Sequence, residues 1–235
     1  MAVVPAARSA AHRLRDELRR RGSAGLRRSP AQARLAQLTV LENEWRGAGV
    51  RDDRINGHLR RLLATCGVTN GRVLEIGGRR HPRGHVFGAG FDYLNLDLEH
   101  SDERTVVGDI TACPEIADAS FDVVVSVDVF EHLDRPWLAA EEITRILAPG
   151  GLSYTSTLFS WRYHPCPIDY YRYTPDALAF LFGGLDVIEQ GFDTTERRRD
   201  VRKKAARDPM PLDALGGWRE NVRVFHAGRK PRTAA

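Results

Sequence analysis

The sequence lacks a long apolar segment, since none of its runs approaches the roughly 20 apolar residues that a bilayer-spanning helix needs. Cysteine is scarce as well: Cys66, Cys113 and Cys166 are widely spaced and form no CxxC pair. This odd, dispersed set excludes a disulfide framework and a cysteine metal knuckle, and it favours a reducing compartment. Arginines follow the apolar start 1–7 instead of preceding it, which is a poor signal-peptide pattern. We therefore expect a cytoplasmic protein with no membrane span.

Acidic residues are rare at both ends of the chain. Residues 1–35 hold nine arginines against two acidic residues, and residues 197–235 hold twelve basic against four acidic ones, although the net charge of all 235 residues is only +4. The middle of the chain is therefore acidic. Basic ends are compatible with a nucleic-acid or anionic-surface partner, but an ordinary solvated surface explains them as well, and we favour that interpretation.

The first 70 residues show helical spacing in three segments. Leu14 and Leu18 lie four apart in the first, and the second continues to Trp45 after Ser29-Pro30, a good helix start. Apolar residues at 55–63 share one face of the third segment, which ends near Gly67. We predict a helical N-terminal extension or lid over residues 1–68 and a core domain over 69–235.

From residue 72 onward, short apolar runs alternate with helical segments. The β-branched run Phe121–Val127 is typical of a strand that is buried on both faces. The alternation predicts an α/β fold with a Rossmann-like, doubly wound, mostly parallel seven-stranded sheet. The expected strands are 72–76, 91–97, 104–107, 121–127, 152–158, 185–189 and 222–225, with helices at 137–147 and 175–181. Residues 149–151 are expected to end the first of these helices, and 197–207 to form an exposed helix or a mobile loop.

Two glycines, Gly77 and Gly78, directly follow the first expected strand. Glycine allows a tight turn and lets a ligand approach the backbone. Asp97 ends the next strand, beside this turn, where a carboxylate can accept hydrogen bonds from a ribose diol. The combination predicts a nucleoside-containing cofactor. The absence of GxGxxG argues against a nicotinamide cofactor, whose pyrophosphate needs such a cradle.

Residues 72–181 resemble the class I S-adenosylmethionine-dependent methyltransferases, in a type 11/23-like branch. The resemblance rests on VLEIGG from Val73, LNLD ending at Asp97, GDI from Gly108, FDVVVS from Phe121, FEHL from Phe130 and ITRILAPGG from Ile143. It implies S-adenosylmethionine as cofactor, S-adenosylhomocysteine as product and no metal ion. The implied cofactor contacts are Glu75 and Gly77 near the methionine portion, Asp97 at the ribose hydroxyls, Asp109 and Ile110 at the adenine, and Val127 and Asp128 beside the sulfonium, with Gly78 and Leu98 as further cofactor-binding residues.

The glycine turn departs from the family's acidic-x-Gly-x-Gly-x-Gly pattern. Arg79 and His81 stand at the second and third glycine positions, and Gly84, Gly88 and Gly90 follow in a glycine-rich segment. We therefore expect this turn to take a variant path. The departure also leaves open a non-catalytic binding or scaffold protein that has kept the fold.

A second cluster, from His164 to Thr174, follows the fifth strand and resembles a segment found in a branch of these methyltransferases. It leaves a strand end beside the expected methyl donor. His164 titrates in the range of a general base, and Asp169 can orient it or act as the base itself, so we predict both to be catalytic. The predicted acceptor-binding residues are Trp161, Tyr170, Tyr171 and Arg172. The alternative is structural, with Asp169 and Arg172 as a salt bridge and the tyrosines as packing.

The expected function is transfer of a methyl group to a small-molecule acceptor, with a hydroxyl of a sugar, nucleoside or natural product preferred because a base candidate is present. The alternatives are N-methylation of a small molecule and methylation of RNA held by the basic ends. His81 and His85 are poor metal-ligand candidates because Pro82 and the glycines break the helix that such a pair needs. The pair Glu131-His132 is interpreted as an anchor for the following helix. A homodimer through the N-terminal helices is compatible with the sequence.

Overall fold

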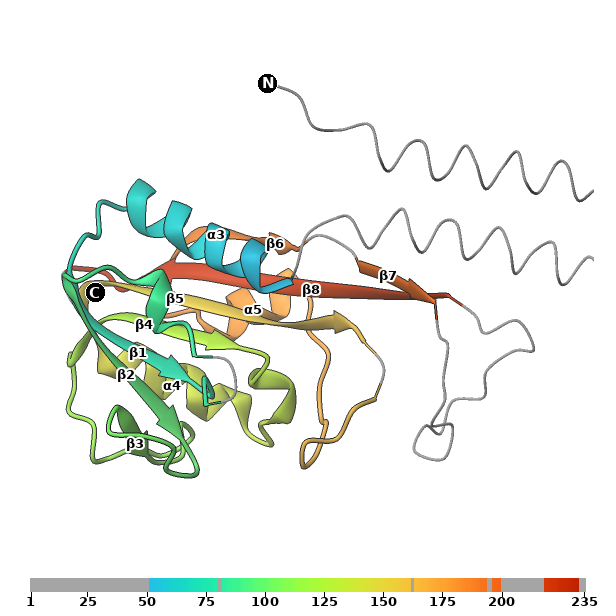
Figure 1. Cartoon of the computed structure of the whole chain (residues 1–235), viewed down its shortest axis with the longest axis horizontal. Helices are drawn as coiled ribbons and strands as arrows, with labels where there is room; N and C mark the ends of the chain where they lie inside the picture. Colours follow the sequence, from blue (N-terminus) through green and yellow to red (C-terminus); the bar gives the residue numbers. More distant parts are fainter. Residues whose placement is uncertain (1–50, 80–81, 162, 194–195, 200–217, 233–235) are drawn as a thin grey trace, which may run out of the picture.

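The computed structural model describes residues 51–79, 82–161, 163–193, 196–199 and 218–232 (Figure 1). The helices predicted before residue 51 lie outside these ranges. The described elements are α3 (Arg51–Thr65), β1 (Gly71–Ile76), η1 (Gly84–Val86), β2 (Phe91–Asp97), β3 (Thr105–Val107), β4 (Phe121–Val127), η2 (Phe130–His132), α4 (Pro136–Ile146), β5 (Leu147–Ser160), α5 (Pro175–Leu181), β6 (Asp186–Phe192), β7 (Glu196–Arg199) and β8 (Trp218–Arg229). Within these ranges, no helix is long and apolar enough to span a membrane.

The strands form one sheet in the order β3-β2-β1-β4-β5-β8-β6, and β7 pairs with β8 beside this path. Strands β1 to β5 run parallel to one another, whereas β8 is antiparallel to both of its neighbours. All seven predicted strands are present, and the predicted Rossmann-like, mostly parallel sheet is confirmed. Crossovers between parallel strands place consecutive strand ends at the same edge of the sheet, where ligands bind in folds of this type.

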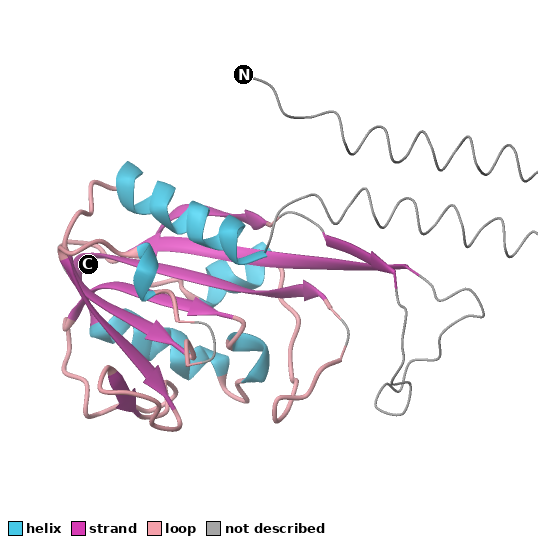
Figure 2. Cartoon of the chain, in the orientation of Figure 1, coloured by secondary structure: helices cyan, strands magenta, loops and turns pink. Residues whose placement is uncertain are grey.

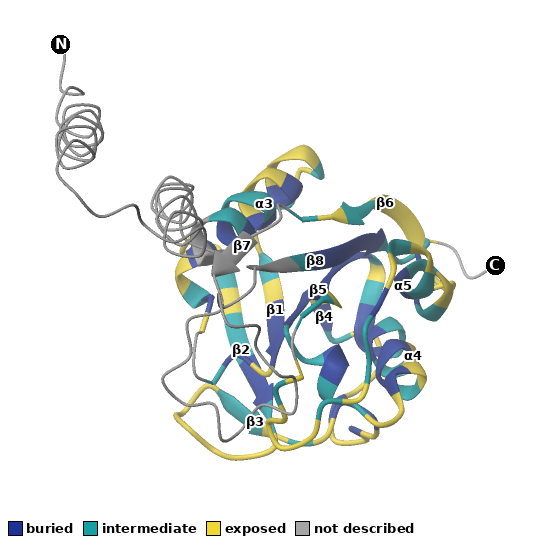
Figure 3. Ribbon diagram, turned by 90° about the vertical axis from the view of Figure 1, so that its right-hand side faces the viewer, coloured by how far each residue is buried: buried dark blue, intermediate teal, exposed yellow. Residues whose placement is uncertain are grey.

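Helices cover both faces of the sheet (Figure 2). On one face, α3 buries Ile55 and Leu59 against side chains of β1, β4 and β5. On the other face, α4 and α5 bury Ile143 and Leu178 against Leu74 and the rest of a second core cluster. Figure 3 shows the resulting buried interior around β4 and β5. The β-branched sequence of β4 suits this place, because six of its seven residues are buried between the two helical layers.

Two local predictions need correction. Residues 149–151 do not end a helix, since α4 stops at Ile146 and β5 already begins at Leu147. Gly150 and Gly151 exchange backbone hydrogen bonds with Lys230, which extends the pairing with β8. Residues 197–199 form part of β7, so the prediction of a helix or loop is wrong there, and 200–207 lie outside the described ranges. The strand forms because the outer part of β8 offers an unpaired backbone edge.

Candidate functional site

The predicted cofactor residues gather where four parallel strands, β1 to β4, end. In the sheet register Ile76 lies opposite Leu96 and also opposite Ser126, so the residues that follow β1, β2 and β4 meet at one edge. The backbone N–H of Gly77 donates to the carbonyl of Leu96 over 2.9 Å, which ties the turn after β1 to the end of β2. The topology thus brings Gly77 and Asp97 together, as the sequence predicted.

Both glycines of the turn are required by local geometry. Gly77 has a φ of +73°, and a Cβ there would lie 2.6 Å from Cγ2 of Val129. A Cβ at Gly78 would lie 2.6 Å from Cδ of Glu75. The Gly78 N–H donates to the side-chain oxygen of Asn95 over 2.9 Å. The turn is therefore held tightly on both sides, and its backbone faces the strand edge without a side chain in the way.

Glu75 is buried under this turn and is already paired. Arg83 binds its carboxylate with the guanidinium and the backbone N–H, each over 2.7 Å, and Tyr93 donates its hydroxyl over 2.5 Å. Burial beside this carboxylate raises the pKa of Tyr93. Glu75 thus holds together the turn and the segment that follows it. Arg83 was missed by sequence reasoning, because its contact depends on the path of the variant loop.

Asp97 and Leu98 lie at the end of β2 with different exposures. The carboxylate of Asp97 is mostly buried, whereas Leu98 is 70% exposed. Arg79, from the glycine turn, places its Nε 3.8 Å from Oδ1 of Asp97 and donates from Nη1 to the carboxylate of Glu99. A carboxylate beside an exposed apolar side chain suits the ribose and the flat face of a nucleoside. The residue at the second glycine position therefore adds a guanidinium to this carboxylate pair.

The next two predicted contacts follow β3. Asp109 is exposed, and its Oδ1 accepts hydrogen bonds from the backbone N–H and hydroxyl of Thr111 over 2.8 and 2.9 Å. Ile110 is buried in the α4-side core, so only its backbone is available to a ligand. The short turn thus fixes the Asp109 carboxylate at the strand edge.

At the end of β4, Val127 is buried and Asp128 takes a φ of +55°, which is uncommon for a residue with a side chain. The Asp128 carboxylate accepts hydrogen bonds from Nε and Nη2 of Arg223 over 3.2 and 3.3 Å. That guanidinium also lies 4.5 Å from the ring centre of Trp161. Arg223 was missed because it comes from β8, far along the chain, and no motif marks it.

The loop after β5 is organised around Asp169, whose side chain is 1% exposed. Arg172 binds both carboxylate oxygens, over 2.5 and 2.7 Å, and the backbone N–H of His164 donates to Oδ2 over 2.8 Å. Burial alone would raise the pKa of Asp169, but these hydrogen bonds outweigh burial and hold it at about 2. Asp169 is therefore an anionic anchor with its oxygens in use, and Arg172 is its partner.

His164 is half-buried, and its Nδ1 lies 3.1 Å from Oδ2 of Asp169. Its ring centre is 5.0 Å from that of His132 and 6.3 Å from that of Trp161. Burial lowers the pKa of His164, against the attraction of Asp169. The imidazole is therefore neutral near pH 7, and its Nδ1 points toward the Asp169 carboxylate.

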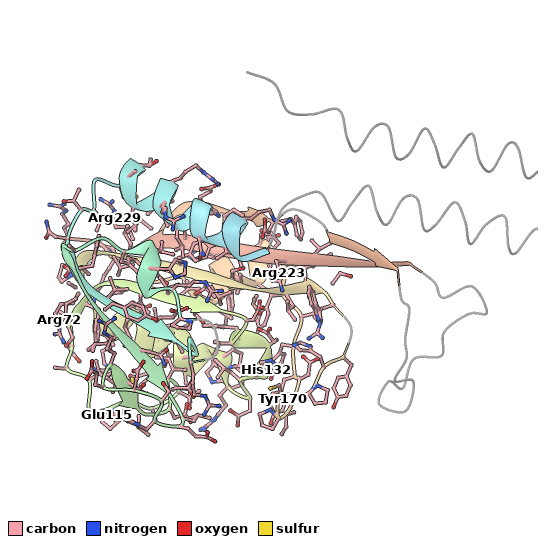
Figure 4. All side chains as sticks on the ribbon, viewed as in Figure 1. Arg72, Glu115, His132, Tyr170, Arg223 and Arg229 are labelled. Atoms are coloured by element: carbon pink, nitrogen blue, oxygen red, sulfur yellow. The ribbon has the colours of Figure 1, made fainter. Side chains whose placement is uncertain are left out.

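The two tyrosines differ in their surroundings. Both donate their backbone N–H to the carbonyl of Glu131, over 2.8 Å for Tyr170 and 3.3 Å for Tyr171. Tyr171 packs against the α4-side core and donates its hydroxyl to the carbonyl of Asp134 over 3.2 Å. Tyr170 is 46% exposed, and Figure 4 shows it at the same edge of the molecule as His132. Of the two, only Tyr170 presents much of its ring to solvent.

The sheet has the Rossmann-like topology of solved methyltransferases, and comparison with known proteins supports a methyltransferase domain in part of the chain. Residues 65–155 match a family model described as a methyltransferase domain. An uncharacterized methyltransferase from Mycolicibacterium gilvum is 30% identical over 125 residues, which cover 46% of this chain and 49% of the relative. One from Mycobacteroides abscessus is 39% identical over 59 residues, covering 24% and 23%. The chain spans about half the length, or less, of these curated relatives.

Solved structures show the same fold. The 1,6-didemethyltoxoflavin-N1-methyltransferase of Burkholderia thailandensis, with bound 1,6-didemethyltoxoflavin and S-adenosylhomocysteine, has a TM-score of 0.54 at 17% identity, covering 88% of this chain and 92% of that chain. The YcgJ protein from Bacillus subtilis has a TM-score of 0.54 at 14% identity, covering 75% and 100%. At these identities the likeness concerns the fold alone. Residues 65–155 thus match a methyltransferase-domain model, and the chain around them has the fold of solved methyltransferases.

Proposed function

We propose that the chain is an S-adenosylmethionine-dependent methyltransferase that methylates a hydroxyl group of a small molecule. The observation that carries the proposal is the meeting of the Gly77 turn with the carboxylates of Asp97 and Asp128 at one sheet edge, within a methyltransferase domain. Carboxylates at this edge complement a cofactor that bears a sulfonium and an ammonium group. A sugar, nucleoside or natural product is the preferred acceptor class.

The residues at the edge fit this cofactor. A Cβ at Gly77 would clash with Val129 and one at Gly78 with Glu75, so only glycines allow this turn; we assign Asp97 to the ribose hydroxyls and exposed Leu98 to the adenine. We assign the Asp109 carboxylate, which the Thr111 hydrogen bonds hold in place, to the adenine amino group. When bound, S-adenosylmethionine supplies an electrophilic methyl group that passes to the acceptor as the carbon–sulfur bond breaks.

The acceptor side is formed by the loop 163–174 and Trp161. Asp169 holds Nδ1 of His164, so the other ring nitrogen is directed away from the anchor. A neutral imidazole keeps a lone pair on that nitrogen, and we assign it to the activation of the acceptor hydroxyl. Exposed Tyr170 and half-exposed Trp161 supply apolar surface beside it. Arg172 positions the loop through Asp169.

Calorimetric titration of the full chain with S-adenosylmethionine tests this proposal. We expect a single saturable site, and Asp97→Ala should weaken binding by about 10- to 100-fold, because hydrogen bonds to a charged group are lost. Asp92→Ala is the matched control, since Asp92 lies on the same strand but is exposed at its opposite end. Absence of binding at millimolar ligand, or equal effects of the two substitutions, would refute the proposed cofactor site.

A further inference from the structure

Glu131 and His132, which follow β4 in η2, meet His164 beside the proposed acceptor site. One carboxylate oxygen and one ring nitrogen from each histidine lie within 4.8 Å of one another. Oε1 of Glu131 lies 4.0 Å from Nε2 of His132. Two imidazoles and one carboxylate are a ligand set that first-row transition-metal ions prefer. The sequence predicted no metal ion and gave the Glu131-His132 pair only an anchoring role.

The Glu131 carboxylate is buried without a full set of partners. Its side chain has no exposed surface, and Oε2 accepts a hydrogen bond from the Thr157 hydroxyl over 2.6 Å. Oε1 accepts none from any residue that the structure describes. Burial, and after it the charge of Asp128, raises the pKa of Glu131 to about 7. The guanidinium groups of Arg172 and Arg223 each pair with an aspartate. A cation at Oε1 would remove the cost of this orphaned oxygen.

Each histidine of the cluster has an oxygen acceptor near its Nδ1. Nδ1 of His132 lies 2.6 Å from the carbonyl of Ile168, and Nδ1 of His164 lies 3.1 Å from the carboxylate of Asp169. An acceptor opposite Nδ1 places the proton there and leaves the lone pair on Nε2. Metal-bound histidines show the same arrangement, with the second ring nitrogen donating to a carbonyl or a carboxylate.

We propose that Glu131, His132 and His164 bind a divalent first-row transition-metal ion that activates the acceptor hydroxyl. This inference rests on the proposed methyl transfer to a hydroxyl group. It replaces the assignment of His164 as the base, because the ring nitrogen of His164 then binds the ion and the ion activates the hydroxyl. The side chains of His132 and His164 are 18% and 35% exposed, so the cluster opens to solvent, and three protein ligands leave positions for water or the acceptor. A hydroxyl bound there loses its proton to solvent water more readily, because the ion stabilises the oxygen anion. Asp169 is then the positioning residue of His164.

Titration of the full chain with Co²⁺, without S-adenosylmethionine, tests the site through visible absorption. We expect one equivalent to bind, and Glu131→Gln and His132→Asn each to lower the affinity about tenfold or more. Asparagine at 132 keeps a donor toward the Ile168 carbonyl while it removes Nε2, so the fold is preserved. His100→Asn, an exposed histidine after β2, is the matched control and should bind like the wild type. Thermal unfolding of each variant checks that it is folded.

The possible results separate this inference from the proposed function. If the folded wild type binds no Co²⁺, or if the cluster variants bind it as tightly as the wild type, the metal site is wrong, even where S-adenosylmethionine binds. If Co²⁺ binds with the expected variant pattern, the site stands, even where S-adenosylmethionine does not bind and the proposed function fails.

Discussion

At the scale of single residues, Gly77 controls the geometry of the proposed cofactor site. Its φ of +73° lies in the left-handed region that side chains disfavour, and Val129 occupies the place where a Cβ would stand. The hydrogen bond from its N–H to Leu96 then fixes the end of β1 against the end of β2. A change at this residue therefore affects both the local backbone and the position of Asp97.

The substitution Gly77→Ala should lower the free energy of unfolding by about 2–4 kcal/mol, because it adds left-handed strain and a clash with Val129. Urea unfolding of the two proteins measures the difference. Gly88→Ala is the control: Gly88 is exposed and has open space at its Cβ position, so its effect should stay within about 0.5 kcal/mol. Equal stabilities of the wild type and Gly77→Ala would contradict the strained turn.

Some residues of the edge follow from the sequence and others do not. Gly77 and Asp97 are predictable, because parallel strands end at one edge and the spacing between the two residues fits one crossover. Arg83 and Arg223 carry no such signal. The first depends on a loop whose path departs from the family pattern, and the second comes from a strand 95 residues beyond its partner Asp128. Side-chain pairing across the fold is set by tertiary geometry, which local patterns do not encode.

At the scale of elements, the loop 163–174 is held by the Asp169 carboxylate. Its bonds to Arg172 and to the His164 backbone join the two ends of the loop, and Tyr173 donates its N–H to the Leu158 carbonyl on β5. The structural alternative in the sequence analysis thus describes the Asp169–Arg172 pair well. The same carboxylate orients the His164 side chain. Asp169 therefore both anchors the loop and positions the His164 imidazole.

Asp169 should make stability depend on pH. Its pKa is about 2 in the folded chain against an ordinary 3.8, so its contribution, on the order of 2 kcal/mol, is complete above about pH 4 and is lost as the pH falls toward 2. Asp169→Asn should therefore cost most at pH 6 and less at pH 3, as measured by urea unfolding. Asp186→Asn, at an exposed site in β6, should show no such trend. A cost that stays constant from pH 6 to pH 3 would contradict the anchor.

The elements themselves were largely predictable. β-branched runs and glycine turns marked the strands, and the helices at 136–146 and 175–181 begin at prolines, as expected at a first helical turn. The arginines of β7 were not predictable as a strand. Their extended form depends on pairing with β8, a non-local contact, and their sequence shows no alternation of apolar and polar residues.

At the scale of the whole molecule, the sheet separates two hydrophobic cores. The ends of its parallel strands form the edge at which we propose that the cofactor and acceptor bind. The acidic middle of the chain supplies the carboxylates of this edge: Asp97 at the end of β2, Asp109 after β3, Asp128 after β4 and Glu131 in η2. The guanidinium groups of Arg79 and Arg223 lie beside Asp97 and Asp128, and the proposed nucleoside and metal sites use Asp97, Asp109 and Glu131. The acidic edge thus connects the charge distribution in the sequence with the proposed reaction.

The location of the cofactor is the central claim, and a crystal structure of the chain soaked with S-adenosylhomocysteine tests it most directly. Density for the nucleoside should appear beyond the ends of β1, β2 and β4, with the ribose hydroxyls on Asp97 and the adenine over Leu98. Density at another place, or a vacant edge at millimolar ligand in crystals whose lattice leaves that edge open, would contradict the account.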